Sequence, residues 1–125
     1  MAKRILIVDD SDFVRTYHSS ILEDAAFDVI TAGDGAEGLE RLYAGEPCDL
    51  IMTDINMRRM DGYEFIRQVR QEDAYSEIPI IIVSTEGDGA DMVKGFEAGA
   101  NLYLVKPCSP AAMIENIQLI LETIA

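Results

Sequence analysis

The sequence predicts an α/β fold in which a five-stranded parallel sheet is covered by helices on both faces. One observation is that five short aliphatic segments alternate along the chain with segments whose apolar residues recur at helical spacing. Another is that capping residues precede the helical segments. Because each right-handed crossover must pass over one face of the sheet, this alternation gives a three-layer sandwich.

The first predicted strand is the aliphatic run at residues 4–9, and capping side chains at 10–12 open a helix after it. The apolar spacing of this helix is carried by Val14, Tyr17, His18, Ile21 and Leu22. A weaker strand follows at 27–32, and Asp34 with Glu37 then resembles a capping box. The second helix has Leu39, Leu42 and Tyr43 on one face. The strand and helix unit therefore repeats.

The third strand, residues 50–53, is an apolar run typical of a strand buried on both faces, and it ends on the carboxylate of Asp54. Asp61 and Glu64 form a second capping pattern before the third helix. That helix carries Phe65, Ile66 and Val69. A polar loop is expected at 73–77.

The fourth strand, residues 78–83, is the most apolar segment and is rich in β-branched residues, which favours a central position. Asp88 can cap a short helix with Met92, Val93 and Phe96. The last strand is 101–105, and Ser109 followed by Pro110 supplies the N-cap and first-turn proline of a closing helix.

Composition narrows the classes of function. The 125 residues fit one domain, residues 1–125, and the formal net charge is −13, from 23 acidic and 10 basic residues. This charge argues against nucleic acid and anionic membranes as partners. Cys48 and Cys108 have neither metal-ligand spacing nor the density of a disulfide scaffold, and no apolar run has the form of a signal peptide or membrane span. We therefore expect a cytoplasmic, monomeric protein.

Polar residues gather where the predicted strands end: Asp9 and Asp10, Asp54, Ser84, and Lys106. Each alone could be a cap, a turn residue or a solvated lysine. Because the carboxyl ends of parallel strands meet at one edge, where such sheets bind ligands, the set together favours a reactive site.

Three neighbouring carboxylates repel one another, and a hard divalent cation relieves this repulsion. All-oxygen ligation suits Mg²⁺, with Mn²⁺ able to substitute, and Asp9, Asp10 and Asp54 would hold it. A carboxylate beside Mg²⁺, an ammonium and a hydroxyl is suited to attack phosphorus, which makes Asp54 the predicted nucleophile.

With these residues, the sequence resembles the receiver domains of two-component response regulators, most closely single-domain chemotaxis regulators of the CheY type. The matching motifs span the chain in order: Asp9-Asp10-Ser11, Asp54-Ile55-Asn56-Met57, Met60-Asp61-Gly62, Ile81-Ile82-Val83-Ser84, Ala98-Gly99-Ala100 and Lys106-Pro107. The resemblance implies a flavodoxin-like sheet of strand order 2-1-3-4-5.

The same resemblance implies that Asp54 accepts a phosphoryl group from a histidine kinase. It adds the main-chain carbonyl of Asn56 to the Mg²⁺ site and places Lys106 and Ser84 on the phosphoryl oxygens. Tyr103 falls at the family's switch aromatic, and Asn56 and Glu86 fall where the family controls the approach of water. A downstream protein would bind the face of helix four, strand five and helix five, around Met92, Lys94 and Tyr103.

This sequence departs from the family pattern at three places. Arg58 stands where the family usually has proline, which removes a φ restraint from the loop after Asp54 and adds a cation near the site. Ser84 replaces the commoner threonine, and residues 86–89 are unusually rich in glycine. The family's cis peptide would lie between Lys106 and Pro107.

Two other classes of function use similar features. A haloacid-dehalogenase-type phosphatase needs a second acid two residues after its nucleophile, where this chain has Asn56. A flavin or nucleotide carrier needs a phosphate-cradling loop after strand one, where acidic residues 9–12 would repel the ligand. Within the receiver interpretation, no output domain is expected, and a phosphorelay intermediate or a phosphate sink is an alternative to a chemotaxis switch. His18 is expected to be a partly exposed side chain rather than a ligand.

Overall fold

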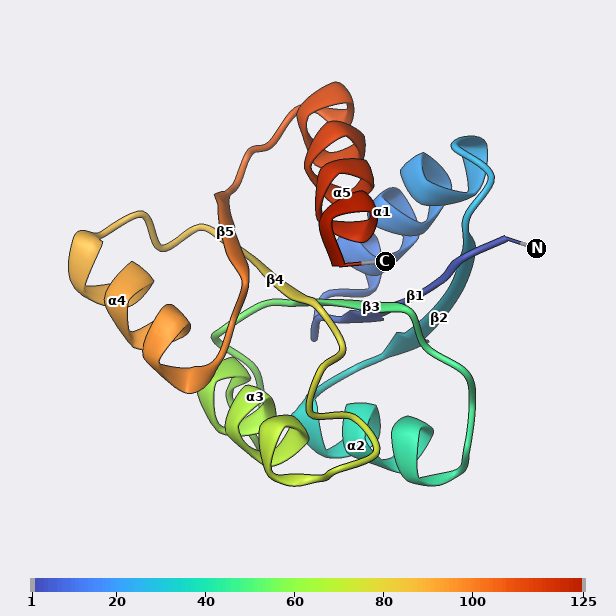
Figure 1. Cartoon of the computed structure of the whole chain (residues 1–125). Helices are drawn as coiled ribbons and strands as arrows, with labels where there is room; N and C mark the ends of the chain where they lie inside the picture. Colours follow the sequence, from blue (N-terminus) through green and yellow to red (C-terminus); the bar gives the residue numbers. More distant parts are fainter. Residues whose placement is uncertain (1, 125) are drawn as a thin grey trace.

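The computed structural model describes residues 2–124 and contains the predicted alternation of strands and helices (Figure 1). The elements are β1 (Arg4–Val8), α1 (Asp12–Asp24), β2 (Asp28–Ala32), α2 (Gly35–Tyr43), β3 (Leu50–Thr53), α3 (Gly62–Gln71), β4 (Ile80–Ser84), α4 (Gly89–Ala98), β5 (Leu102–Val105) and α5 (Pro110–Ile124). The strands pair in parallel in the order β2-β1-β3-β4-β5, so the strand order implied by the family resemblance is confirmed.

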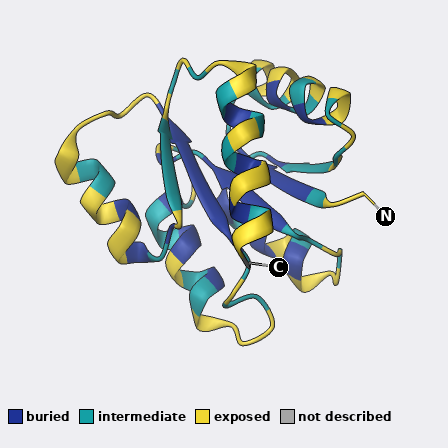
Figure 2. Cartoon of the chain, turned by 45° about the horizontal axis from the view of Figure 1, so that its top comes forward, coloured by how far each residue is buried: buried dark blue, intermediate teal, exposed yellow. Residues whose placement is uncertain are grey.

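Helices cover both faces of the sheet, with α1 and α5 on one side and α2, α3 and α4 on the other (Figure 1). Successive side chains of β1 point to opposite faces: Leu6 and Val8 pack with the α2, α3 and α4 side, and Ile5 and Ile7 pack with the α1 and α5 side. The three central strands β1, β3 and β4 are therefore buried on both faces, whereas the edge strands β2 and β5 are partly exposed (Figure 2).

The predicted caps are present at the helix starts. The side chains of Ser11, Asp34, Asp61 and Asp88 accept hydrogen bonds from backbone N–H groups of α1, α2, α3 and α4. Ser109 Oγ accepts from the N–H of Ala112 at 3.1 Å in the first turn of α5. Each bond satisfies a backbone donor that has no partner within its own helix.

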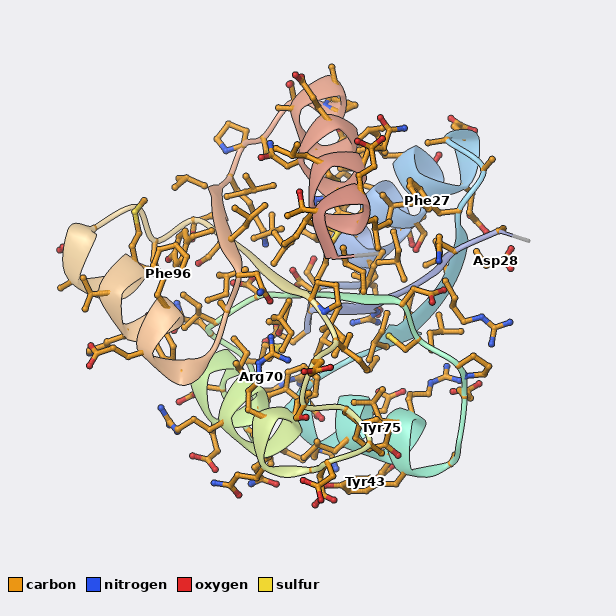
Figure 3. The ribbon with its side chains drawn as sticks, viewed as in Figure 1. Phe27, Asp28, Tyr43, Arg70, Tyr75 and Phe96 are labelled. Carbon is orange, nitrogen blue, oxygen red and sulfur yellow. The ribbon has the colours of Figure 1, made fainter. Side chains whose placement is uncertain are left out.

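The expectation that His18 is partly exposed was wrong. His18 is 6% exposed and, with Leu22, is one of the buried residues of α1, so its ring is turned away from solvent. Tyr17 and Tyr43 are 46% and 53% exposed, although their spacing places them next to the apolar faces of α1 and α2. Both lie at the border of those faces, and the Tyr43 ring packs against Tyr75 with centroids 6.2 Å apart (Figure 3).

Arg70 closes the edge of the sheet where the strands begin (Figure 3). Its guanidinium donates hydrogen bonds to the carbonyl oxygens of Ser76, Ile78 and Gly99 and to the Asn101 side chain. Burial lowers the pKa of Arg70 from its ordinary value. These bonds tie the end of α3 to the starts of β4 and β5.

None of the helices within residues 2–124 is long and apolar enough to cross a membrane.

Candidate functional site

The residues that follow the strands lie at one edge because the backbone ladders continue one step past the strand ends. The N–H of Asp9 donates to Ala32 O at 3.1 Å, and the N–H of Asp54 donates to Val8 O at 2.9 Å. The N–H of Lys106 donates to Ser84 O at 2.7 Å. The positions of Asp9, Asp54 and Lys106 are therefore set by the register of the sheet.

Lys106 joins two carboxylates at this edge. Its Nζ lies 3.0 Å from Asp9 Oδ2 and 3.0 Å from Asp54 Oδ2. The side chains of Asp9, Asp54 and Lys106 are 5%, 15% and 15% exposed, so the cluster is largely shielded from water. Burial lowers the pKa of Lys106, but the bonds to Asp54 and Asp9 outweigh burial, and its pKa is raised above the ordinary value. Lys106 therefore stays charged at neutral pH.

The second oxygen of each bridged carboxylate is held by the backbone. Asp9 Oδ1 accepts from the N–H of Ser11 at 2.9 Å, and Asp54 Oδ1 accepts from the N–H of Ile55 at 2.6 Å. Each carboxylate is thus oriented from two directions. The peptide bond between Lys106 and Pro107 is cis.

Asp10 is half-buried beside this cluster, and no hydrogen bond or ion pair of its carboxylate is found among residues 2–124. Within the same residues, no three acidic, histidine or cysteine side chains gather closely enough to form a ready metal site. The structure instead places the Lys106 ammonium between Asp9 and Asp54. The three predicted carboxylates are neighbours, but they are not arranged as a finished ligand set.

The donor chemistry nevertheless fits a hard cation. Asp9, Asp10 and Asp54 offer carboxylate oxygens, and the Asn56 carbonyl oxygen accepts no backbone hydrogen bond within the described part of the chain. Oxygen donors of this kind are those that Mg²⁺ prefers. A cation here would share with Lys106 the neutralisation of the acidic cluster.

A second group of predicted residues lies on the β4 side of Asp54. Ser84 is fully buried, and its Oγ accepts from the N–H of Glu86 at 3.1 Å. The exposed Glu86 side chain accepts from Asn56 Nδ2 at 3.1 Å through Oε1, and its carbonyl accepts from the Tyr103 hydroxyl at 2.5 Å. One residue of the loop after β4 therefore contacts three of the predicted site residues.

The Tyr103 ring lies on the α4 side of β5. A Cβ atom added at Gly95 of α4 would come within 3.3 Å of Tyr103 Cδ2, so the ring and the helix are in close contact. Burial raises the pKa of the Tyr103 hydroxyl, which therefore stays protonated and able to donate at neutral pH. Tyr103 thus links β5, α4 and the loop after β4.

Comparisons with known proteins place the whole chain in one family. A model of the response regulator receiver domain matches residues 5–118. The chemotaxis protein CheY1 of Helicobacter pylori is 36% identical over 96% of this chain and 98% of that protein. The solved structure of the chemotaxis protein CheY4 of Vibrio cholerae has a TM-score of 0.91 at 35% identity, covering 96% of this chain and 99% of that one. The regulatory protein PhoP of Bacillus subtilis is 37% identical over 98% of this chain but only 50% of its own length.

The chain belongs to the response regulator receiver family.

Membership in this family settles the broad class of function. Receiver domains of the CheY type act in two-component signalling, where they interact with histidine kinases and downstream proteins. They are signalling proteins and not classical enzymes, so the family match does not support a phosphatase or a flavin carrier. Receiver domains generally bind Mg²⁺, in agreement with the oxygen donors at this edge.

The receiver also presents apolar side chains on α4 and β5. Val93, Phe96 and Val105 are 56%, 50% and 38% exposed, and Phe96 lies on the outer helix in Figure 3. Lys94 is exposed, whereas Met92 is only partly so. The sequence predicted Val93 and Phe96 on this helix, but their spacing alone did not show that they are exposed to solvent.

Sequence reasoning missed one pair beside the site. Arg59 donates to Asp34 through Nε at 2.7 Å and through Nη2 at 3.1 Å. The sequence drew attention to Arg58 as the added cation, but Arg58 is exposed, and no hydrogen bond or ion pair of its side chain is found among residues 2–124. The only available signal was the pair of adjacent arginines in the loop after Asp54, and the partner lies 25 residues earlier in the chain.

Proposed function

We propose that this receiver is a chemotaxis-type switch in which Asp54 accepts a phosphoryl group from the phosphohistidine of a histidine kinase. The observation that carries the proposal is the Lys106 ammonium, which lies 3.0 Å from both Asp54 Oδ2 and Asp9 Oδ2. This cation is anchored at the position where an incoming phosphoryl group would need charge compensation. Lys106 balances one of the three negative charges that Asp9, Asp10 and Asp54 bring to the site.

In the proposed reaction, a carboxylate oxygen of Asp54 attacks phosphorus while the bond from phosphorus to the imidazole nitrogen breaks. The electron pair of that bond leaves with the imidazole, and an acyl phosphate forms on Asp54. The backbone N–H of Ile55 holds Asp54 Oδ1, which orients the carboxylate for in-line attack. Lys106 and the Ser84 hydroxyl then contact phosphoryl oxygens, and Lys106 lies close enough to move with little rearrangement.

Mg²⁺ would be held by Asp9, Asp10, Asp54 and the Asn56 carbonyl, and when bound it supplies positive charge for the phosphoryl oxygens. Asp10 is the residue that must turn toward the cluster, since its carboxylate is not engaged by Lys106. Mn²⁺ would serve in place of Mg²⁺ because it accepts the same oxygen ligands.

Intact-mass measurement tests this assignment. Wild-type protein with Mg²⁺ and a small phosphodonor should gain one acid-labile phosphoryl group, and chelation of Mg²⁺ should prevent the gain. Asp54→Asn keeps the size of the side chain but removes the nucleophile, and it should gain none. Asp10→Asn should still be modified at high Mg²⁺, but at a higher Mg²⁺ requirement. Equal modification of wild type and Asp54→Asn would contradict the assignment.

Asn56 and Glu86 are proposed to set the lifetime of the acyl phosphate. Their side chains are exposed and hydrogen-bonded to each other at 3.1 Å, beside Asp54. Polar groups at this place can orient an attacking water, whereas apolar ones would shield the phosphorus. Asn56→Leu and Glu86→Leu should each slow dephosphorylation about tenfold, as part of a typical positioning effect. An unchanged rate in both variants would contradict this role.

The output is proposed to pass through Ser84 and Tyr103. When the Ser84 hydroxyl turns to the phosphoryl group, its bond to the Glu86 N–H is lost, and the loop that Tyr103 holds is free to move. Tyr103 can then turn inward, into the space beside Ser84. The two states need differ by only a few kcal/mol, and a charge-assisted hydrogen bond supplies part of that difference.

The partner surface would be the face of α4, β5 and α5, around Met92, Lys94 and Tyr103. The exposed Val93 and Phe96 give this face the apolar contacts that protein interfaces use. Pull-down with and without a phosphoryl mimic should show binding that strengthens with the mimic. Tyr103→Ala should lose most of that response, and a full response in this variant would mean that the coupling runs elsewhere. Return of the phosphoryl group to a second histidine, without such binding, would favour a relay or sink.

A further inference from the structure

We propose that Arg59 is a positioning residue for the metal site: its ion pair with Asp34 holds the loop after β3 so that the Asn56 carbonyl faces the acidic cluster. This inference rests on the proposed Mg²⁺ site. It begins from the loop itself, residues 55–61, which must turn from the end of β3 into α3. This loop contains no proline, so no ring restrains φ at Arg58 or its neighbours.

The backbone of the loop is tightly constrained at Arg59. This residue has φ of +67°, in the left-handed region that arginine seldom adopts. Such a conformation persists only where surrounding contacts determine it. Next to it, the N–H of Met60 donates to Arg58 O at 2.7 Å, and the N–H of Gly62 donates to Ile55 O at 2.7 Å. The loop is therefore closed upon itself around Asn56.

The contact that determines Arg59 comes from the start of α2. Asp34 is buried, and one of its oxygens accepts from the N–H of Glu37 as the cap of α2. The Glu37 carboxylate in turn accepts from the N–H of Gly33 at 2.7 Å. The backbone of α2 thus holds the Asp34 carboxylate in place independently of Arg59. The Arg59 guanidinium then donates to both of its oxygens.

The start of α2 is itself joined to the acidic cluster. Ala32 O accepts from the N–H of Asp9, so the hydrogen-bond ladder between β1 and β2 continues as far as the acidic cluster. Asp10, Asp34 and Arg59 line the same hollow in the surface. Arg59 therefore links the loop that carries the Asn56 carbonyl to the start of α2, which lies beside Asp9 and Asp10. This arrangement fixes the two halves of the metal site relative to each other.

The charge of Arg59 and its ion pair with Asp34 have opposite predicted effects on the affinity for Mg²⁺, which makes the inference testable. An arginine near a divalent cation repels it, so loss of the charge alone should strengthen Mg²⁺ binding. Loss of the ion pair should weaken binding, because the Asn56 carbonyl is then free to turn away. Arg59→Asn removes the guanidinium, and asparagine tolerates a positive φ, so the substitution adds no backbone strain. Arg58→Asn is the matched control, since Arg58 is exposed and its side chain makes no hydrogen bond or ion pair among residues 2–124.

The experiment is calorimetric titration of Mg²⁺ into the wild-type protein and both variants. Loss of a ligand's supporting partner typically weakens metal binding about 10–100-fold, and since Arg59 acts through the backbone we expect its Kd to rise about 3–10-fold. Arg58→Asn should bind as tightly as wild type or more so. At saturating Mg²⁺ the rate of phosphorylation of Arg59→Asn should return to the wild-type value. Asp34→Asn, which keeps a good N-cap, should add little further loss in the Arg59→Asn background.

A Kd for Arg59→Asn equal to or below that of wild type would overturn the inference, and so would equal losses in the two arginine variants. A phosphorylation rate of Arg59→Asn that stays low at saturating Mg²⁺ would overturn it as well. Such a result would mean that the substitution damages more than the affinity for Mg²⁺. Failure of wild type itself to bind Mg²⁺ would contradict the proposed function, and the metal role of Arg59 with it. The wild-type titration therefore separates the two failures.

Discussion

The two sides of Asp54 are built differently. On the side of β1 and β2, the loops that follow β1, β2 and β3 are joined to one another through Lys106, through the Ala32 carbonyl and through the pair of Arg59 and Asp34. On the side of β4, residues 85–90 are all exposed (Figure 2), and the loop is held by its bonds to Ser84, Asn56 and Tyr103. Each of those three bonds involves Glu86.

This difference fits the roles proposed for the two sides, called below the fixed side (β1 and β2) and the β4 side. Phosphoryl transfer and metal binding need groups whose positions do not change during the reaction. A signal needs an element that can change place at low cost, and such elements have few buried contacts. The fixed side therefore suits the chemistry, and the side of β4 suits the output.

The largest expected effect comes from placing one methyl group on each side. A Cβ at Gly62 would lie 2.1 Å from the carbonyl oxygen of Asp54, whereas a Cβ at Gly89 would meet no atom within 4 Å. Gly62→Ala should lower the free energy of unfolding by about 3 kcal/mol, because neither backbone can yield. Gly89→Ala should stay within about 0.5 kcal/mol of wild type. Urea denaturation measures both, and similar losses would remove the distinction between the two sides.

The next effect concerns the cation of the fixed side. Lys106→Met leaves Asp9 and Asp54 facing each other in a shielded place, and the free energy of unfolding should fall by about 2 kcal/mol at pH 7 without Mg²⁺. Because the pKa of Lys106 is raised, its contribution is fully present below the ordinary value of 10.5 and is lost only as pH rises beyond it. Lys94→Met, at an exposed lysine of α4, is the control and should change stability little.

If Lys106→Met and Lys94→Met destabilise the receiver equally at pH 7, the bridge between the carboxylates contributes nothing beyond a surface charge. Mg²⁺ should restore part of the stability of Lys106→Met, since it offers the missing positive charge. It should leave the difference between wild type and Lys94→Met unchanged.

A smaller effect is expected on the β4 side. Tyr103→Phe removes the hydroxyl that donates to Glu86 O and should lower the free energy of unfolding by no more than about 1 kcal/mol. Its main result should be faster hydrogen exchange in residues 85–90, since the loop loses one of its bonds. Tyr17→Phe, in the exposed aromatic pair of α1, should alter neither quantity. Unchanged exchange in Tyr103→Phe would show that the loop is held by other contacts.

The smallest expected effect is the pH dependence of stability that comes from His18, a buried residue of α1. Burial and the Lys106 charge lower the pKa of His18 below its ordinary value of 6.5, and Asp9 and Asp54 oppose them. Its contribution to stability is therefore present above pH 6.5 and is lost as pH falls through the lowered folded pKa, because the unfolded state takes up the proton first. His18→Leu should show a smaller loss of stability than wild type between pH 7.5 and 5.5. A larger loss in the variant would reverse the sign and exclude this account.

The strand ends could be predicted from the sequence because each apolar run stops at a polar residue, and parallel strands must end at one edge. Asp9, Asp54 and Lys106 needed no further information. The burial of His18 could not be predicted, since helical spacing does not decide which way a polar ring at the border of a face will turn. The pair of Arg59 and Asp34 depends on how two loops approach each other in space, which spacing does not encode.

The central claim is that a phosphoryl group on Asp54 changes the β4 side and leaves the fixed side in place. Hydrogen exchange tests it directly, in receiver loaded with Mg²⁺ and then with Mg²⁺ plus the phosphoryl mimic beryllofluoride. Amides of residues 85–92 should change their exchange rates about tenfold on addition of the mimic, while those of 33–38 and 59–65 should change less than about twofold. Asp54→Asn should show neither change. Equal changes on both sides, or changes confined to 33–38 and 59–65, would contradict the claim.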